Sequence, residues 1–182
     1  MNFKTSNVEH YTSPRELNVD EILKAYGTSL ADMKQAIKDT AFVLRGSFPI
    51  TKDLSKQLED LLERLFTKGG AMLYRCGYSK TMGETSDVAV GRKGHPKKIF
   101  IEIEFRPNEH KDILKFLIGY KQQILELGIL LVAINRESIA KHYYTMPEYE
   151  KCVQIIKELQ SDCPILVIGF DGQMISNEGI ET

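Results

Sequence analysis

The chain has 182 residues, of which 42% are hydrophobic and 27% charged, so its composition supports a packed core and excludes global disorder. Its 24 Lys and Arg residues nearly balance 25 Asp and Glu residues, giving a formal net charge of −1. That balance excludes a wholly basic nucleic-acid coat protein, although it leaves room for a local basic site. No apolar run approaches the roughly 20 residues that span a bilayer.

The cysteines and the first residues indicate the compartment. Cys76, Cys152 and Cys163 are an odd number at wide spacing, which is typical of neither a disulfide framework nor a zinc site. The first residues lack the apolar stretch of a signal peptide. We therefore expect a soluble, reduced, cytoplasmic protein with no membrane partner.

The first part of the chain is predicted to be helical after a polar start. Residues 1–18 are polar and predict an irregular arm. Apolar residues then recur every three or four positions over 19–44, which predicts a helix that is broken or bent near Gly27. A second helix is predicted over 51–68. We divide the chain into an N-terminal arm and helical segment (1–50) and an α/β core (51–182), within one compact domain overall.

From residue 71 onward strands and helices alternate. The predicted strands lie at 71–78, 87–91, 97–105, 128–135 and 163–170. The predicted helices run from a cap at Asn108 to about 127 and from 147 to 160, and the tail after 170 looks weakly ordered. This order predicts an α/β protein with a mixed central sheet flanked by helices. A right-handed parallel crossover joins strands 97–105 and 128–135.

The strand over 97–105 carries the most informative side chains. Because side chains alternate along a strand, Glu102 and Glu104 share a face opposite to that of Ile101 and Ile103. Asp87 opens the preceding strand, and antiparallel pairing would bring it across from this pair. Three converging carboxylates favour a hard divalent cation with oxygen ligands. The alternative is that Glu102 and Glu104 face water on an edge strand.

A basic turn lies between these two strands. Residues 51–100 carry ten positive and six negative side chains, and the positive excess peaks in the segment 91–98. Such a turn can contact phosphates. It can equally be a solvated hairpin turn, because Gly and Pro punctuate it.

Asp87, followed after fourteen residues by Glu102-Ile103-Glu104, resembles the core of the PD-(D/E)XK nucleases. The likeness is greatest to BamHI- and BglII-type restriction endonucleases, in which Glu or Gln replaces the usual lysine. The segment after the acidic strand is similar to the family's central block through Asn108, Asp112, Phe116, Asn135 and Arg136. The resemblance covers about residues 51–136. Two departures are Ser86, where the family has Pro, and Glu104, where it usually has Lys.

The resemblance implies a restriction-endonuclease-like core and a Mg²⁺-dependent endonuclease that cuts double-stranded DNA, in the first place a type II restriction enzyme acting as a homodimer. Asp87 and Glu102 would hold Mg²⁺, and Glu104 would orient or deprotonate the attacking water. Glu63, with Glu59 behind it, would complete the catalytic set from the preceding helix. The alternative for Glu63 is an ordinary exposed helix residue.

DNA contacts are expected from polar residues on both sides of this site, with polar surface loops as the alternative. These residues are Lys93, Lys97, Lys98, Arg106, Asn108, Asn135, Arg136, Ser138, Lys141 and His142. Two other functions stay open. The chain can be a repair or defence nuclease that recognises DNA structure or damage. It can also be a non-catalytic α/β interaction protein with Glu102 and Glu104 at its surface.

Overall fold

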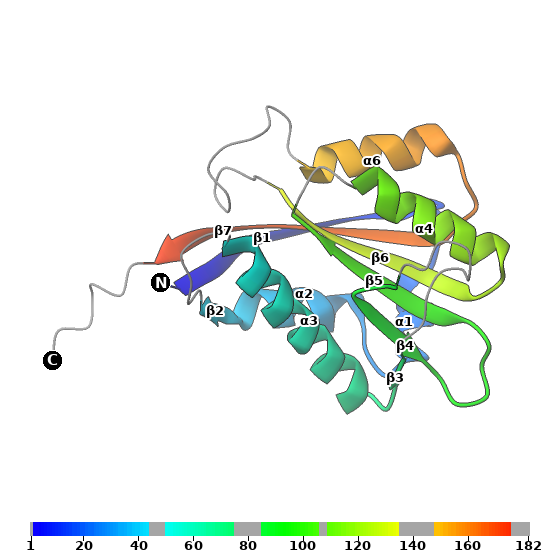
Figure 1. The fold of residues 1–182 in the computed structure, drawn as a ribbon, viewed down its shortest axis with the longest axis horizontal. Coiled ribbons are helices and arrows are strands. Elements are labelled where there is room, and N and C mark those ends of the chain that lie inside the picture. Colours follow the sequence, from blue (N-terminus) through cyan, green and yellow to red (C-terminus); the bar gives the residue numbers. More distant parts are fainter. Residues whose placement is uncertain (1, 44–49, 75–84, 106–108, 135–147, 176–182) are drawn as a thin grey trace, which may run out of the picture.

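The computed structural model describes residues 2–43, 50–74, 85–105, 109–134 and 148–175 (Figure 1). Within them seven strands form one sheet in the order β2-β1-β7-β6-β5-β4-β3. The strands are β1 (Asn2–Ser13), β2 (Ala41–Val43), β3 (Met72–Tyr74), β4 (Val88–Gly91), β5 (Lys98–Glu104), β6 (Leu125–Ala133) and β7 (Ile165–Ile175). The helices are α1 (Val19–Lys24), α2 (Leu30–Asp39), α3 (Ile50–Lys68), α4 (Glu109–Lys121) and α6 (Glu148–Leu159).

The sheet is mixed, as the sequence predicts. Strands β5, β6 and β7 run parallel in its centre. The outer strands β1, β2, β3 and β4 pair antiparallel. The parallel step from β5 to β6 passes through α4, which lies on one face of the sheet (Figure 1). Because β5 has a neighbour on each side, it is an inner strand whose backbone groups are paired across both edges.

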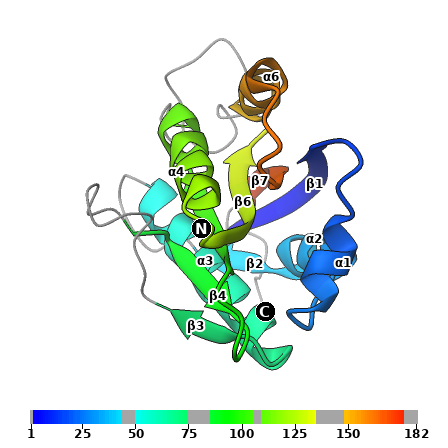
Figure 2. The ribbon, with the colours of Figure 1, turned by 90° about the vertical axis from the view of Figure 1, so that its right-hand side faces the viewer.

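Helices cover both faces of the sheet (Figure 2). The first core packs α1, α2 and α3 against one face, where Ile101 of β5 and Leu58 of α3 are buried. The second core packs α4 and α6 against the other face, where Phe100 and Phe116 are buried. Side-chain alternation in β5 sends neighbouring residues into these two different layers. Glu102 therefore shares its face with Phe100 and lies beneath α4.

The predicted arm over residues 1–18 is wrong for its first part. Residues Asn2–Ser13 form the strand β1, which pairs with β7 along its whole length and with β2 at its start. Its buried residues Phe3 and Val8 belong to the core beneath α2. Both parts of the proposed division at residue 50 thus contribute strands to one sheet. The division itself stays a prediction.

The break predicted near Gly27 is confirmed, whereas the predicted end of the helix at residue 44 is wrong, because Ala41–Val43 form the strand β2. The chain forms α1 and α2 with Asn18 and Ser29 as separate N-caps, and each cap side chain accepts a backbone N–H. Gly27 between them has φ +75°, and its backbone packs directly on that of Gly69 after α3. A side chain at either position would meet the other's backbone, so the two glycines allow the helices to pack this closely.

Two later boundaries shift as well. The helix predicted to reach residue 127 ends at Lys121, after which Gln123 has φ +58° and β6 starts at Leu125. The tail, predicted to be weakly ordered, continues β7 as far as Ile175, and residues after it lie outside the described part. Among the described helices, none combines the length and hydropathy that a bilayer crossing requires.

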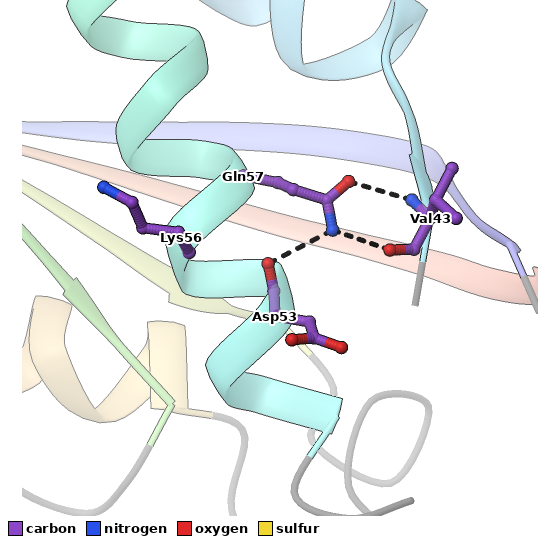
Figure 3. A pocket seen from close by; sticks show the side chains of 4 residues that line it. All are labelled: Val43, Asp53, Lys56 and Gln57. Carbon is purple, nitrogen blue, oxygen red and sulfur yellow. Dashed lines mark hydrogen bonds between the residues drawn. The ribbon is translucent and has the colours of Figure 1, made fainter. Parts of the chain in front are cut away.

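A side-chain amide replaces a strand partner at the edge of the sheet. Gln57 of α3 accepts a hydrogen bond from the Val43 N–H at 2.9 Å and donates to the Val43 carbonyl at 2.8 Å (Figure 3). Asp53 and Lys56 complete the shallow pocket of about 350 Å³ around it. None of these residues belongs to the acidic strand pair. The hydrogen bonds between Gln57 and Val43 satisfy backbone groups at the edge of β2 and hold this edge to α3.

We expect Gln57→Ala to lower the free energy of unfolding by about 1 kcal/mol, because water can replace part of the three lost hydrogen bonds, two to Val43 and one to the Asp53 carbonyl. Urea unfolding would measure the change. Gln154→Ala is the matched control, since Gln154 is exposed and bonds only to Glu158 on its own helix among the contacts described. Equal losses in the two variants would contradict the role assigned to Gln57.

Candidate active site

Asp87 and Glu102 lie side by side at the junction of β4 and β5. The two strands pair antiparallel, and their ladder ends with Val88 opposite Ile101, so Asp87, directly before β4, lies next to the part of β5 that carries Glu102 and Ile103. The Ile103 N–H donates to Asp87 Oδ2 at 2.8 Å, which fixes this carboxylate against β5. The pair stands near the carboxyl end of β5, the end at which open α/β sheets form ligand crevices.

Glu102 is buried, with only 3% of its surface exposed. The alternative that it faces water on an edge strand is therefore wrong, since β5 lies between β4 and β6. Its Oε2 accepts a hydrogen bond from Lys115 Nζ at 3.0 Å. Burying a carboxylate is costly unless a counter-charge accompanies it, and Lys115 supplies that charge. Glu104, two residues further on the same face, is half-buried.

Helix α4 presents the counter-charge together with a second acid. Lys115 Nζ lies 2.9 Å from Asp112 Oδ1, three residues earlier on the same helix face. Asp112 and Lys115 are both buried, beside the apolar residues Ile113 and Phe116 that hold α4 to the sheet. Burial alone would lower the pKa of Lys115. The charge of Glu102 and the hydrogen bond to Asp112 outweigh burial and raise the pKa above its ordinary value.

The electrostatics at Asp87 are those of a crowded acidic site. The surface of Asp87 as a whole is exposed, but its carboxylate lies among protein atoms. This partial burial of the carboxylate raises the pKa of Asp87 above its ordinary value. The Ile103 N–H opposes that shift, the charge of Glu59 adds to it, and the charge of Lys115 again opposes it. Burial is therefore the main reason for the raised pKa of Asp87, and the charges of Glu59 and Asp112 add to it.

The donor set of Asp87 and Glu102 fits a hard divalent cation in its chemistry. Carboxylate oxygens are the ligands that Mg²⁺ prefers, and a cation beside Asp87 would stabilise its charged form against burial and against the charge of Glu59. In the part of the chain that the structure describes, no three His, Cys, Asp or Glu side chains group closely enough to hold a metal ion. Two carboxylates and water or substrate oxygens are therefore the ligands that this arrangement offers.

Helix α3 carries Glu59 and Glu63, the two acidic residues predicted to complete the site, and Glu59 acts electrostatically on Asp87. The charge of Glu59 raises the pKa of Asp87, and its side chain is half-buried. Glu59 also accepts a hydrogen bond from the exposed Lys56 at 3.1 Å. Glu63 lies about one turn further along α3, and its assignment as a catalytic residue stays a prediction.

The basic turn lies at the opposite end of β5 from the acidic pair. Lys98 begins the strand and Glu102 follows four residues later, a separation of roughly 13 Å at about 3.3 Å per residue. Lys98 Nζ stacks on the Tyr74 ring, with 5.0 Å to its centroid. Lys93 is exposed and Lys97 half-buried. The predicted DNA contacts of these three lysines therefore lie away from the Asp87–Glu102 pair.

A polar cluster anchors this turn to the body of the protein. Arg92 Nη2 donates to Glu126 Oε1 at 3.0 Å, and the Tyr26 hydroxyl donates to Glu126 Oε2 at 2.5 Å. His95 Nδ1 lies 3.3 Å from the same carboxylate, and the Arg92 guanidinium stacks over the Tyr26 ring. Burial, followed by the hydrogen bond to Glu126, raises the pKa of Tyr26 above its ordinary value. Arg92 is thus engaged by an internal carboxylate.

Several predicted DNA contacts fall outside the described residues. They are Arg106, Asn108, Asn135, Arg136, Ser138, Lys141 and His142. Their positions in the chain follow β5 and β6, the two parallel strands nearest the acidic pair. They stay predictions.

The sequence does not lead us to predict Lys115 as a site residue, and Asp112 is named only as part of the resemblance. The available signal was the spacing Asp112-x-x-Lys115 on the helix face that also carries Ile113 and Phe116. A lysine on the apolar face of a helix needs a buried partner, and the acidic strand just before the helix supplies one. The sequence does not reveal that the partner is Glu102.

No protein-family model matches the sequence, and no curated protein matches it. Two solved structures are similar to the chain. Free BglII shares 11% identity, with 94% of this chain and 81% of the other covered at a TM-score of 0.49. The restriction endonuclease BglII complexed with a DNA 16-mer shares 13% identity, with 90% and 76% covered at a TM-score of 0.57. The second match shows that the chain has a BglII-type, restriction-endonuclease-like fold.

Proposed function

We propose that this chain, whose fold is that of BglII-type restriction endonucleases, is a Mg²⁺-dependent endonuclease that hydrolyses phosphodiester bonds in double-stranded DNA. The observation that carries the proposal is the proximity of Asp87, directly before β4, to Glu102 near the carboxyl end of β5. A fold found in DNA-cutting enzymes hosts many activities, so the acidic pair and not the fold alone supports the function. The finer proposal is a type II site-specific restriction endonuclease.

Each acidic residue of the site would have its own role in hydrolysis. Asp87 and Glu102 would hold Mg²⁺, which supplies stabilisation of the charge on the scissile phosphate and lowers the pKa of an attacking water. Glu104 shares their face at the end of β5, where it would orient the water and accept its proton. Glu59, whose charge reaches Asp87, supports a third acidic position from α3. Glu63 is the second choice for that position.

A homodimer suits this activity. Each subunit would cut one strand of the duplex, and a palindromic site would match the two-fold axis. Contacts with DNA close to the cut would come from Arg106, Asn108, Asn135, Arg136, Ser138, Lys141 and His142. Lys93 and Lys97 would contact phosphates further along the duplex.

The test is to incubate the purified protein with unmethylated plasmid and phage DNAs, with Mg²⁺ or with EDTA, and to separate the products on a gel. We expect discrete bands with Mg²⁺ only. A Mg²⁺-dependent smear would replace site specificity with a nuclease that recognises structure or damage. Intact DNA across several divalent metals and salt concentrations would contradict the nuclease proposal and favour a non-catalytic interaction protein.

A further inference from the structure

Three buried charges meet beneath α4. Lys115 Nζ lies 3.0 Å from Glu102 Oε2 and 2.9 Å from Asp112 Oδ1. The side chains of the three residues are 7%, 4% and 5% exposed, in the order Lys115, Glu102, Asp112. The cluster carries one positive and two negative charges, and Asp87 adds a third negative charge within electrostatic range. The Lys115 ammonium group therefore lies between two buried carboxylates and within electrostatic range of a third.

The ammonium group is held in this position by its own helix. Asp112 lies three residues before Lys115, so the intrahelical ion pair directs the long lysine side chain toward β5. Phe116 packs against the sheet beside it and fixes α4 there. Without Lys115, the buried Glu102 carboxylate would lose the cation that the described structure places on its Oε2.

We propose that Lys115 is a positioning residue that acts as the resident counter-cation of Glu102 and competes with the divalent ion for this carboxylate. The proposal rests on the proposed function, since it takes Glu102 to be a metal ligand. The ammonium and a divalent cation repel each other at this range in a partly desolvated site, so each weakens the binding of the other. Lys115 thus keeps Glu102 oriented in the metal-free protein and lowers the affinity of this carboxylate for the divalent ion.

Removing the charge of Lys115 should change stability and metal affinity in opposite directions. Removing the positive charge should weaken the metal-free fold, because Glu102 and Asp112 then repel each other without a cation. The same change should strengthen the binding of a divalent ion, because the ion no longer competes with an ammonium group. A residue with a merely structural role would lower stability and leave metal affinity unchanged or weaker.

The experiment titrates MnCl2 into the DNA-free protein by isothermal titration calorimetry and records thermal unfolding with and without MnCl2. Lys115→Met removes the charge and keeps the chain length. We expect its dissociation constant for Mn²⁺ to fall by about tenfold or more, and its Tm to rise more on adding Mn²⁺ than that of the wild type. Lys121→Met removes the same charge from the exposed end of α4 and should match the wild type.

Two further variants keep the test decisive. Lys115→Gln retains a hydrogen-bond donor, so it provides the same measurement if Lys115→Met does not fold. Lys115→Arg keeps the charge and should keep the weak wild-type affinity. Unchanged or weaker Mn²⁺ binding by Lys115→Met or Lys115→Gln would overturn the role of Lys115 alone. Absence of Mn²⁺ binding in every protein would overturn the metal site of the proposed function, and this inference with it.

Discussion

Glu102→Gln is expected to lower the rate of Mg²⁺-dependent DNA cleavage by at least about a hundredfold. Loss of a residue that only supports a metal ligand typically costs 10–100-fold, so loss of a ligand itself should cost at least as much. The amide keeps the size of the side chain and one oxygen, but it removes the negative charge that attracts the ion. Single-turnover cleavage of a plasmid would measure the change.

The variant should still fold. Lys115 keeps Asp112 as a partner at 2.9 Å, so its charge is not left unpaired. We therefore expect a loss of about 1–3 kcal/mol, smaller than the 3–5 kcal/mol of breaking an isolated buried pair. Glu16→Gln is the matched control, because Glu16 is exposed and lies away from the site. It follows the end of β1 that pairs with the amino end of β7, whereas the acidic pair lies near the carboxyl end of β5. Wild-type cleavage by Glu102→Gln would contradict the site assignment.

Phe116→Ala is expected to lower the free energy of unfolding by about 3–5 kcal/mol, a large part of the 5–15 kcal/mol typical of a domain. The Phe116 ring is fully buried between α4 and the sheet. It packs on Gly128 of β6, where an added Cβ would lie 2.5 Å from the ring. No small residue can fill the space that the ring occupies, so truncation leaves a cavity.

Urea unfolding of the two proteins would provide the value. Leu114→Ala is the control on the same helix, because half of the Leu114 surface is exposed and its truncation should cost well under 1 kcal/mol. The effect of Phe116→Ala bears on the site as well, since the same helix carries Asp112 and Lys115. A loss below 1 kcal/mol for Phe116→Ala would mean that α4 is not fixed by this contact.

The central strands and their helices could be predicted from sequence because each has a strong local pattern. The strand over 97–105 is rich in Ile and Phe, and the apolar run from 128 predicts a strand buried on both faces, as β5 and β6 are. Helix α3 matches its predicted range to within a residue because its apolar stripe is regular and Gly69 and Gly70 follow it.

Strand β1 was not predictable from the same rules. It buries few apolar side chains: Phe3 and Val8 lie in the core beneath α2, and Tyr11 packs partly buried against the other core. A register shift between Thr5 and Asn7 also breaks the alternation that marks a strand. The strand exists because β2 and β7 pair with its backbone on both sides, and those partners are distant in sequence.

The acidic pair could be predicted and its counter-charge could not. Asp87 and Glu102 are joined by one hairpin, so strand register alone brings them together. The contact between Glu102 and Lys115 depends on how α4 packs over β5, which no periodicity in the sequence specifies. Glu59 was the second choice for the acidic residue from α3, because its orientation toward Asp87 depends on how α3 packs against the sheet.

The most direct measurement of the central claim compares wild-type protein and Glu102→Gln, purified identically, on one supercoiled plasmid with Mg²⁺ and with EDTA. The proposed site predicts cleavage by the wild type with Mg²⁺ only, and at least about a hundredfold less by the variant. The comparison also excludes a contaminating nuclease, which would cut in both preparations. Equal cleavage by the two proteins, or cleavage that persists in EDTA, would contradict a metal-dependent site built on Glu102.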